Sequence, residues 1–367
     1  MMTGSRKRAL IVDDSAVMRS LLRSAIVSGT ALEVAGAAVD GEAALAAVDS
    51  LHPDIVLLDV EMPRMDGLTT LRKLRERGHH MPVIMCSSLT QRGARVTIEA
   101  LASGASDYVA KPAAQTDRGA ALSALSQELL PKIRALTSAG AAGRRNATPP
   151  AFIAPFIRSD VGAPKVLVIG VSTGGPAALD VLLPALPRDF PLPVLIVQHM
   201  PEVFTALMAE RLDQRCPLRV REAIEGESVR PGVAWLARGN WHLEIRASLC
   251  SQPAPTLHLT QGAEENHCRP SVDVLFRSAA SVYGPGVLAV VLTGMGCDGL
   301  AGCRIVRGNG GFVMVQDQAS SVVWGMPAAV ANDGIAQRVL PLDAIAAEIL
   351  RVNSRAPYEL SDQDGAA

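Results

Sequence analysis

Short apolar runs alternate with longer amphipathic stretches in two parts of this 367-residue chain. Runs of this kind, each followed by a helical pattern, are typical of parallel β-strands whose sheet is covered by helices on both faces. We therefore predict an α/β protein with two doubly wound parallel-sheet domains, over about residues 8–137 and 165–355.

The predicted strands are the apolar runs themselves. In the first part they are Ala9–Val12, Glu33–Ala37, Ile55–Leu58, Val83–Cys86 and Ser106–Val109. In the second part they include Val166–Val171, Val194–Gln198, Val233–Leu236, Val287–Leu292 and Gly311–Val315.

The segment between the two parts has a different composition. Residues 138–164 are rich in Ala, Gly and Pro and show no sustained period, which is typical of a linker. We expect domains over residues 1–137 and 165–355, joined by this linker and followed by a polar tail over residues 356–367.

Composition and charge narrow the class of protein. The chain is 49% hydrophobic and 19% charged, which is ordinary for globular domains with full cores. With 35 basic and 36 acidic residues, and equal numbers of each up to residue 115, it offers no basic surface for nucleic acid.

The sequence also indicates the cellular compartment of the protein. No apolar run approaches the roughly 18 residues of a membrane helix, and the first run ends at Asp13, which argues against a signal peptide. The six cysteines have no CxxC spacing, so a reducing compartment is the simplest setting. We expect a cytoplasmic monomer without membrane insertion.

Polar residues follow four of the first five predicted strands. Asp13 and Asp14 come after the first strand, Asp59 after the third, Ser87 after the fourth and Lys111 after the fifth. The carboxyl ends of parallel strands line one crevice, so these side chains should converge there.

The residue types fit a phosphorylation pocket. Three carboxylates are hard oxygen ligands for Mg²⁺, Asp59 can attack a phosphoryl group, and Lys111 supplies a positive charge to its oxygens. Taken singly, the aspartate pair could be a helix cap and Lys111-Pro112 a turn. Their joint placement at four strand ends favours the pocket.

The segments VDDS, LLDVEMPRMDG, MCSSLT and SDYVAKP resemble the receiver domains of two-component response regulators, over about residues 7–125. The resemblance implies a flavodoxin-like fold, phosphorylation of Asp59, and Mg²⁺ held by three carboxylates and the backbone carbonyl of Glu61. The implied metal-site residues are Asp13, Asp14, Asp59 and Glu61. The implied switch residues are Ser87, Tyr108 and Lys111.

Ser172 lies in the second part, where the run VLVIGV meets the turn STGG and a helix expected near Pro176. Backbone N–H groups at a helix N-terminus suit an oxyanion or a phosphate. A nucleotide-binding glycine loop is the alternative, but the segment has neither GxGxxG nor GK[ST] spacing.

Two more strand ends carry groups that could activate this serine. His199 follows the run VLIVQ, and Asp298 lies in the glycine-rich segment after VVLTG. A serine hydroxyl needs a base, and the base needs an orienting group. The order Ser, His, Asp is compatible with a triad, because unrelated hydrolases already use different orders. Taken alone, Ser172 could be a helix cap, His199 a half-buried histidine and Asp298 a turn residue.

The segments IGVSTGGP, VQHMPEVFT, CRPSVDVLF, LTGMGCDGLAG and SSVVWGMPAAV resemble the chemotaxis protein-glutamate methylesterases, over about residues 160–350. That family combines a receiver with a Rossmann-like catalytic domain. It hydrolyses glutamate γ-methyl esters on chemoreceptors, releasing methanol, and many members also deamidate receptor glutamines.

The resemblance assigns roles residue by residue. Ser172 is the expected nucleophile, His199 the base and Asp298 the orienting carboxylate. Thr173 and Arg269 are expected to shape the site, and residues 324–327 to pack behind it. The candidate oxyanion donors are the backbone N–H groups of Gly294, Met295 and Gly296.

The implied partners are chemoreceptors as substrate and a chemotaxis histidine kinase as phosphodonor. The implied cofactor is Mg²⁺ in the receiver domain, with none for the ester hydrolysis. The receiver is expected to pack over the catalytic mouth until Asp59 is phosphorylated.

Two cysteines depart from the family pattern. Cys297 replaces an asparagine often found before the triad aspartate, and Cys268 stands where histidine is expected before Arg-Pro. Both are interpreted as small packing residues. A second hypothesis for Cys297 is that it makes the activity sensitive to thiol reagents.

Three hypotheses for the whole chain follow. The leading one is a phosphorylation-regulated methylesterase. The second is a receiver-linked adaptor with an inactive hydrolase fold, which the presence of all three triad residues disfavours. The third is a DNA-binding response regulator, which the neutral charge and the βα pattern disfavour.

Overall fold

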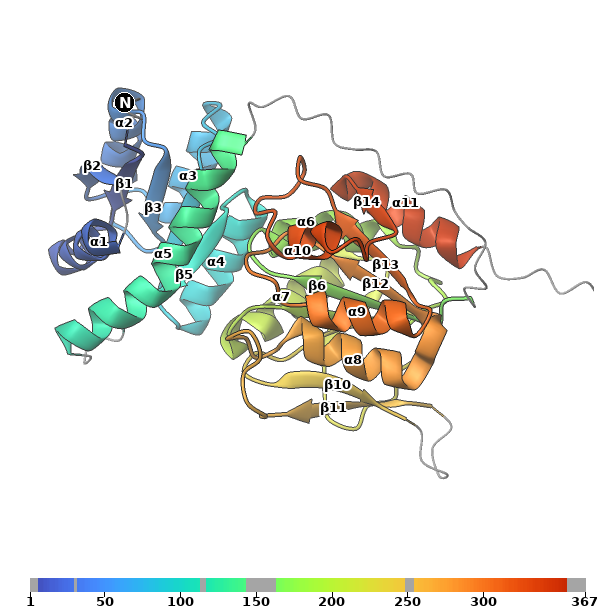
Figure 1. The fold of residues 1–367 in the computed structure, drawn as a ribbon. Coiled ribbons are helices and arrows are strands. Elements are labelled where there is room, and N and C mark those ends of the chain that lie inside the picture. The colour runs from blue at the N-terminus through green and yellow to red at the C-terminus, as the bar shows by residue number, and fades with distance from the viewer. Residues whose placement is uncertain (1–5, 30–31, 113–116, 143–162, 248–253, 355–367) are drawn as a thin grey trace, which may run out of the picture.

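The computed structural model describes residues 6–29, 32–112, 117–142, 163–247 and 254–354. These residues form two α/β domains that lie side by side (Figure 1). Across the described ranges, no helix combines the length and apolar character that spanning a membrane would require.

The first domain is a five-stranded parallel sheet in the order β2-β1-β3-β4-β5. This is the flavodoxin-like order that the first resemblance implies. Its strands are β1 (Arg8–Val12), β2 (Glu33–Ala38), β3 (Ile55–Asp59), β4 (Val83–Ser87) and β5 (Asp107–Ala110). Its helices are α1 (Ala16–Gly29), α2 (Gly41–Leu51), α3 (Gly67–Glu76), α4 (Gln91–Ala102) and α5 (Arg118–Ala142).

The second domain is a seven-stranded parallel sheet in the order β14-β13-β12-β6-β7-β9-β8, with a separate antiparallel hairpin β10-β11. Its strands are β6 (Val166–Val171), β7 (Val194–Gln198), β8 (Arg219–Glu222), β9 (Val233–Leu236), β10 (His242–Arg246), β11 (Thr256–Thr260), β12 (Val287–Val291), β13 (Phe312–Gln316) and β14 (Arg338–Leu340). Its helices are α6 (Gly175–Leu182), η1 (Leu183–Ala185), α7 (Glu202–Arg215), α8 (Val272–Tyr283), η2 (Gly284–Gly286), α9 (Leu300–Gly308), α10 (Met326–Asn332) and α11 (Leu342–Asn353).

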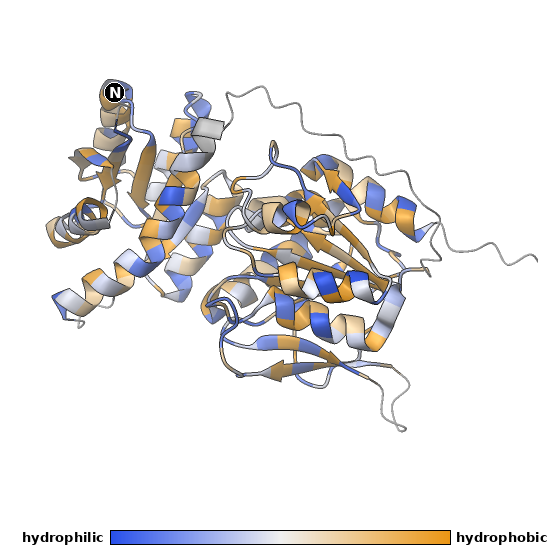
Figure 2. Ribbon diagram, viewed as in Figure 1, coloured by the Kyte–Doolittle hydropathy of each residue, from blue (hydrophilic) through white to orange (hydrophobic). Residues whose placement is uncertain are grey.

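The central strands of both sheets are buried because helices cover both faces. Strands β3, β6 and β12 are buried at every position, as continuous apolar runs in a parallel sheet should be. Figure 2 shows the same contrast, with hydrophobic strands inside and helices of mixed character outside. The ten strands expected from the sequence are present, each end within one residue of the expected position.

Strand β6 is the point where the second sheet changes direction. The chain adds β7, β9 and β8 on one side of β6 and β12, β13 and β14 on the other. In doubly wound sheets, ligands bind at the carboxyl ends of the strands beside such a switch point. A ligand site is therefore expected at the loops after β6, β7 and β12.

The segment expected to link the domains is partly helical. Helix α5 continues to Ala142, beyond the boundary expected at residue 137. Residues 143–162, which make up most of the expected linker, and the tail from residue 355 lie outside the described residues.

The two domains share a packed boundary. Helix α4 lies against α6 and α7 of the second domain, and the Tyr108 ring in β5 stacks on Phe204 in α7 with centroids 4.6 Å apart. On the second domain, Val323 joins the apolar cluster that α5 forms with the first sheet, and Met295 packs against that cluster. The receiver-like domain thus contacts the loops beside the switch point of the second sheet.

Candidate active site

The polar residues at the carboxyl end of the first sheet converge as predicted. Lys111 Nζ lies 2.8 Å from Asp13 Oδ2 and 2.7 Å from Asp59 Oδ1. Oxygens of Asp13, Asp14 and Asp59 all lie within 4.8 Å of one another. Asp13 and Asp59 are buried, whereas Asp14 is exposed, so the pocket opens to solvent on the Asp14 side.

These residues fit a Mg²⁺ site. The donor set is entirely hard oxygen, and Asp13 Oδ2 is buried without a hydrogen bond, its close contact being the ion pair with Lys111. Burial raises the pKa of Asp59 to about 6, against the hydrogen bond and charge of Lys111, and the neighbouring Asp13 charge adds to the rise. The Glu61 N–H donates to Asp59 Oδ1 (3.3 Å), which places the Glu61 backbone beside the pocket.

Two expected switch residues, Ser87 and Tyr108, have different surroundings. Ser87 ends β4, is fully buried, and accepts a hydrogen bond from Thr97 Oγ1 (2.7 Å). Tyr108 is also buried, but its ring is turned toward Phe204 in the second domain, and Lys132 Nζ lies 4.8 Å from its ring centroid. Tyr108 and Lys111 are three residues apart, so β5 links the acidic pocket to the domain boundary.

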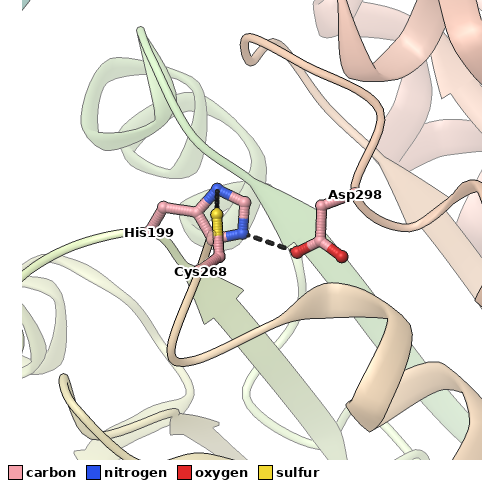
Figure 3. Close-up of side chains that lie close together, drawn as sticks. All are labelled: His199, Cys268 and Asp298. Atoms are coloured by element: carbon pink, nitrogen blue, oxygen red, sulfur yellow. Dashed lines mark hydrogen bonds and ion pairs between the residues drawn. The ribbon is translucent and has the colours of Figure 1, made fainter. Parts of the chain in front are cut away.

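The three candidate triad residues occupy the loops after adjacent strands. Ser172 follows β6, His199 follows β7 and Asp298 lies in the loop after β12. His199 Nε2 and Asp298 Oδ2 are hydrogen-bonded at 2.8 Å (Figure 3). Within the described part of the chain, no hydrogen bond joins Ser172 Oγ to His199, although both residues line one cavity. The structure thus brings the histidine and aspartate into contact and places the serine nearby.

The N-terminal end of helix α8 holds the Asp298 carboxylate. The Val272 N–H donates to Oδ2 (2.7 Å), while Ser271 Oγ (2.8 Å) and the Asp273 N–H (3.2 Å) donate to Oδ1. Burial alone would raise the pKa of Asp298, but the hydrogen bond and charge of His199 and these α8 donors lower it to about 2. The helix dipole also favours a negative charge here. Asp298 is therefore a fixed, ionised carboxylate hydrogen-bonded to His199.

His199 is held by that carboxylate and by a thiol. Because Nε2 donates to Asp298, Nδ1 is the nitrogen left to accept a proton. Cys268 Sγ lies 3.7 Å from Nδ1, and Figure 3 shows the sulfur in front of the imidazole. Burial lowers the pKa of His199, but its hydrogen bond to Asp298 and the contact with Cys268 outweigh this effect and raise the pKa to about 9.

The cavity over Ser172 has a volume of about 1040 Å³ and is walled by both domains. Among its lining residues from the second domain are Ser172, Thr173, His199, Cys268, Met295 and Gly296. Those from α5 and β5 are Asp107, Tyr108, Gln127, Glu128, Pro131 and Lys132. The first domain thus forms one wall of the cavity that holds the serine and histidine of the candidate triad.

The candidate oxyanion donors are not equivalent. The Gly294 N–H donates to the Val323 carbonyl (3.0 Å), so this group is already occupied. Gly294 allows close approach instead, since a Cβ there would lie 2.8 Å from the Ser172 Cβ. Met295 and Gly296 line the cavity and remain the better placed donors.

Several contributing residues were not singled out from the sequence. Asn266 Nδ2 donates to Asp298 Oδ1 (3.0 Å), and Gln198 Nε2 donates to the Ser172 carbonyl (3.0 Å). Asp107 accepts a hydrogen bond from Thr173 Oγ1 (2.6 Å), across the domain boundary and beside the serine. Asp107 and Gln198 lie within segments that carried the resemblance, but a contact between two domains has no signal in a linear pattern.

Two residues expected around the site have mainly structural contacts. Arg269 donates to Asn240 Oδ1 (2.8 Å) and to the Gly262 carbonyl (2.8 Å), which holds the loop before α8. Trp324 Nε1 donates to the Gln316 carbonyl (3.2 Å), and Met326 is buried behind the site.

Known proteins resemble the chain over nearly its full length. A family model described as CheB methylesterase matches residues 167–349, and one described as response regulator receiver domain matches residues 9–122. The protein-glutamate methylesterase/protein-glutamine glutaminase of Nocardioides sp. is 47% identical, over 94% of this chain and 94% of its own. The protein of the same name from Trichodesmium erythraeum is 44% identical, over 94% of this chain and 98% of its own.

A solved structure supports the fold of the second domain. The crystal structure of the Thermotoga maritima CheB methylesterase catalytic domain superimposes with a TM-score of 0.50 at 41% identity. The match covers 52% of this chain and 99% of that chain.

Proposed function

The chain belongs to the protein-glutamate methylesterase/protein-glutamine glutaminase family with an N-terminal receiver domain, and from that premise we propose that Ser172, His199 and Asp298 carry its reaction. Its substrates are glutamate γ-methyl esters on chemoreceptors, which it hydrolyses with release of methanol. Receptor glutamines are deamidated at the same site. Phosphorylation of Asp59 in the receiver controls both reactions.

In the first half of the reaction, Ser172 Oγ attacks the ester carbonyl carbon and its proton passes to His199. The accepting atom is Nδ1, because Nε2 donates to Asp298. The ionised Asp298 keeps the ring in this tautomer and stabilises the imidazolium. The N–H groups of Met295 and Gly296 stabilise the oxyanion.

In the second half, His199 returns its proton to the leaving methoxide, and methanol departs from the acyl-enzyme. Water then attacks the acyl carbon, with His199 as base, and free glutamate and Ser172 are regenerated. A glutamine side chain follows the same path, with ammonia as the leaving group. No cofactor is required for these steps.

The receiver restrains the reaction in the arrangement described above. Its helix α5 and strand β5 wall the cavity, and Asp107 accepts a hydrogen bond from Thr173, next to the nucleophile. A receptor helix about 10–12 Å in diameter must approach Ser172 from this side. Separation of the two domains is therefore part of activation.

Phosphorylation acts through the acidic pocket and β5. A histidine kinase of the chemotaxis pathway supplies the phosphoryl group to Asp59, with Asp13, Asp14, Asp59 and the Glu61 carbonyl holding Mg²⁺. When bound, Mg²⁺ neutralises the phosphoryl oxygens and the carboxylates. Lys111 and Ser87 bind the phosphoryl oxygens, which moves the end of β5 that also carries Tyr108 and Asp107. The enzyme works in the cytoplasm, where the kinase and the receptor domains are found.

The contact between His199 and Asp298, with Ser172 in the same cavity, carries the proposal. We would measure methanol release from methylated receptor by the wild type, Ser172→Ala and Asp59→Asn, with and without a small-molecule phosphodonor. Ser172→Ala should lower the rate by about 10⁴–10⁶-fold, and Asp59→Asn should lose only the stimulation. A Ser172→Ala variant with the wild-type rate would exclude the triad and favour the adaptor hypothesis.

Removal of residues 1–160 tests the restraint. The isolated catalytic domain should release methanol faster than the unphosphorylated full chain, by about 5–150-fold if the coupling is of ordinary size. An isolated domain that is slower than the full chain would contradict autoinhibition by the receiver.

A further inference from the structure

Cys268 places a sulfur beside the proposed catalytic base, His199. It lies in the loop before α8, half-buried, and it lines the cavity that holds Ser172. Its Sγ is 3.7 Å from His199 Nδ1 and 3.4 Å from the Asn266 carbonyl oxygen. The mechanism above assigns Nδ1 to Ser172 but gives the thiol no part.

The surroundings of His199 provide a proton acceptor for the Cys268 thiol. Nε2 donates to an aspartate whose charge is held by donors of α8, so the ring accepts a further proton at Nδ1 and the resulting imidazolium is stabilised. The 3.7 Å contact places an imidazole nitrogen where it can take the thiol proton as the sulfur attacks an electrophile. Cys268, His199 and Asp298 are therefore arranged as in a cysteine-type catalytic array.

The other described cysteines differ in their surroundings. Cys86 and Cys303 are buried, and burial raises the pKa of each well above its usual range. Burial also raises the pKa of Cys216, to about 11. Cys297 is exposed, and no hydrogen bond to its sulfur is found within the described residues. It is therefore a matched control, an accessible thiol that has no imidazole beside it.

We propose that Cys268 is an oxidation site for hydroperoxides, and that its oxidation reversibly inactivates the hydrolase. Cys268 gives its proton to His199 Nδ1 as its sulfur attacks the terminal peroxide oxygen, the S–O bond forms and the O–O bond breaks. The leaving hydroxide or alkoxide takes that proton from the His199 imidazolium and departs as water or an alcohol. The sulfur is oxidised to a sulfenic acid and the peroxide is reduced; a dithiol reductant restores the thiol.

Inactivation follows from the position of the oxidised sulfur and rests on the proposed function of His199. A sulfenic acid at Cys268 places an added oxygen between the sulfur and Nδ1, which are 3.7 Å apart before oxidation. Its hydroxyl hydrogen-bonds to Nδ1, so that this nitrogen no longer accepts the proton of Ser172. The nucleophile itself is unchanged, which is why reduction restores activity.

The first experiment measures how strongly His199 activates Cys268, and it does not depend on the hydrolase reaction. The full chain and His199→Gln are treated with iodoacetamide at pH 7, and carbamidomethylation of each cysteine peptide is followed by mass spectrometry. In His199→Gln, labelling of Cys268 should be about tenfold slower or more, and labelling of Cys297 should be unchanged. Equal labelling of Cys268 in both proteins would overturn the proposal.

The second experiment tests inactivation. The wild type, Cys297→Ser and Cys268→Ser are treated with hydrogen peroxide and then dithiothreitol, and each methanol-release rate is compared with that of its own untreated sample. The wild type and Cys297→Ser should lose and regain activity, while Cys268→Ser should keep its untreated rate. Loss in Cys268→Ser as fast as in the wild type would overturn the switch.

If Cys268→Ser does not fold, trapping of the sulfenic acid by dimedone on the wild-type Cys268 peptide decides the same point. An adduct on Cys268 that appears in step with the loss of activity supports the switch, and loss without an adduct overturns it. Failure of the proposed hydrolase function would appear separately, as absence of methanol release before any treatment.

Discussion

Asp59 and Asp298 are both buried at the carboxyl ends of parallel sheets, yet their carboxylates are held in opposite ways. Asp298 receives donors from His199, Ser271 and the first N–H groups of α8, and its pKa falls to about 2. Asp59 is buried with few donors, namely Lys111 and one N–H at 3.3 Å, and its pKa rises to about 6.

The difference shows how the same position in a parallel-sheet fold can hold two kinds of carboxylate. A carboxylate whose charge is fully compensated by the protein is rigid and permanently ionised, as an orienting group must be. A buried carboxylate with few hydrogen-bond donors is destabilised in its ionised form. A bound cation or a covalent modification of the carboxylate removes that destabilisation. The hydrogen bond and charge of His199, followed by the donors at the start of α8, lower the pKa of Asp298, whereas burial outweighs the hydrogen bond and charge of Lys111 at Asp59.

The largest effect is expected when the charge of Asp298 is removed. Asp298→Asn should lower the rate of methanol release by about 10⁴-fold, because the amide can hold His199 in the wrong tautomer and cannot stabilise the imidazolium. The rate would be compared with that of Asp59→Asn without phosphodonor. An Asp298→Asn rate within tenfold of wild type would contradict the orienting role.

A pH profile tests the effect of Asp298 on His199. In the proposed mechanism the neutral form of His199 is the base. Because its pKa is raised to about 9, deprotonation should limit the activity below that pH. We expect kcat/KM to rise by about tenfold per pH unit and to level off near pH 9. Ser172→Ala measured in parallel corrects for spontaneous ester hydrolysis. A plateau already reached at pH 7 would show that the imidazole is neutral there.

The two aspartates should also affect stability with opposite signs. For Asp59 the folded-state pKa of about 6 exceeds the ordinary 3.8, so stability present at low pH is lost as the pH rises through this window. For Asp298 the folded pKa of about 2 lies below 3.8, so stability is present above 3.8 and lost as the pH falls through about 2.

At pH 8 without Mg²⁺, Asp59→Asn should therefore stabilise the receiver, and Asp298→Asn should destabilise the catalytic domain, each by about 1–3 kcal/mol. Urea unfolding of the full chain, followed by a probe in each domain, measures both changes. Destabilisation by Asp59→Asn would mean that Lys111 more than compensates the buried charge.

The contrast between the aspartates also marks what the sequence could predict. The ten strands and the residues that follow them were visible as continuous apolar runs bounded by polar residues. Strands β8, β10, β11 and β14 were not, because they are short edge strands or a hairpin in which polar and apolar residues alternate. Buried parallel strands leave a strong signal, and exposed ones do not.

Contacts between distant segments were the part that could not be predicted. The residues Ser172, His199 and Asp298 were identified from their motifs, but nothing in a linear pattern shows that α8 donates to Asp298 or that Cys268 contacts His199. Likewise, Tyr108 was expected as a switch residue, whereas its partner Phe204 lies 96 positions away on the other domain. Such pairs depend on how two folded domains meet.

The smallest expected effect concerns the rings of Tyr108 and Phe204, which stack at the boundary between the two domains. The Tyr108 and Phe204 rings stack with centroids 4.6 Å apart and planes 24° from parallel. A buried aromatic pair contributes about 0.5–1.5 kcal/mol beyond its area, so its loss should raise the undocked population and the basal rate about 2–12-fold.

Tyr108→Leu and Phe204→Leu keep an apolar side chain on each surface and remove the stacking. Each single variant should raise the rate of methanol release measured without phosphodonor, and the double variant should add little to either one. That non-additivity identifies the ring pair as the contact being lost. If the two single effects multiply in the double variant, the rings act independently and the docking energy resides elsewhere, in contacts such as the hydrogen bond between Thr173 and Asp107.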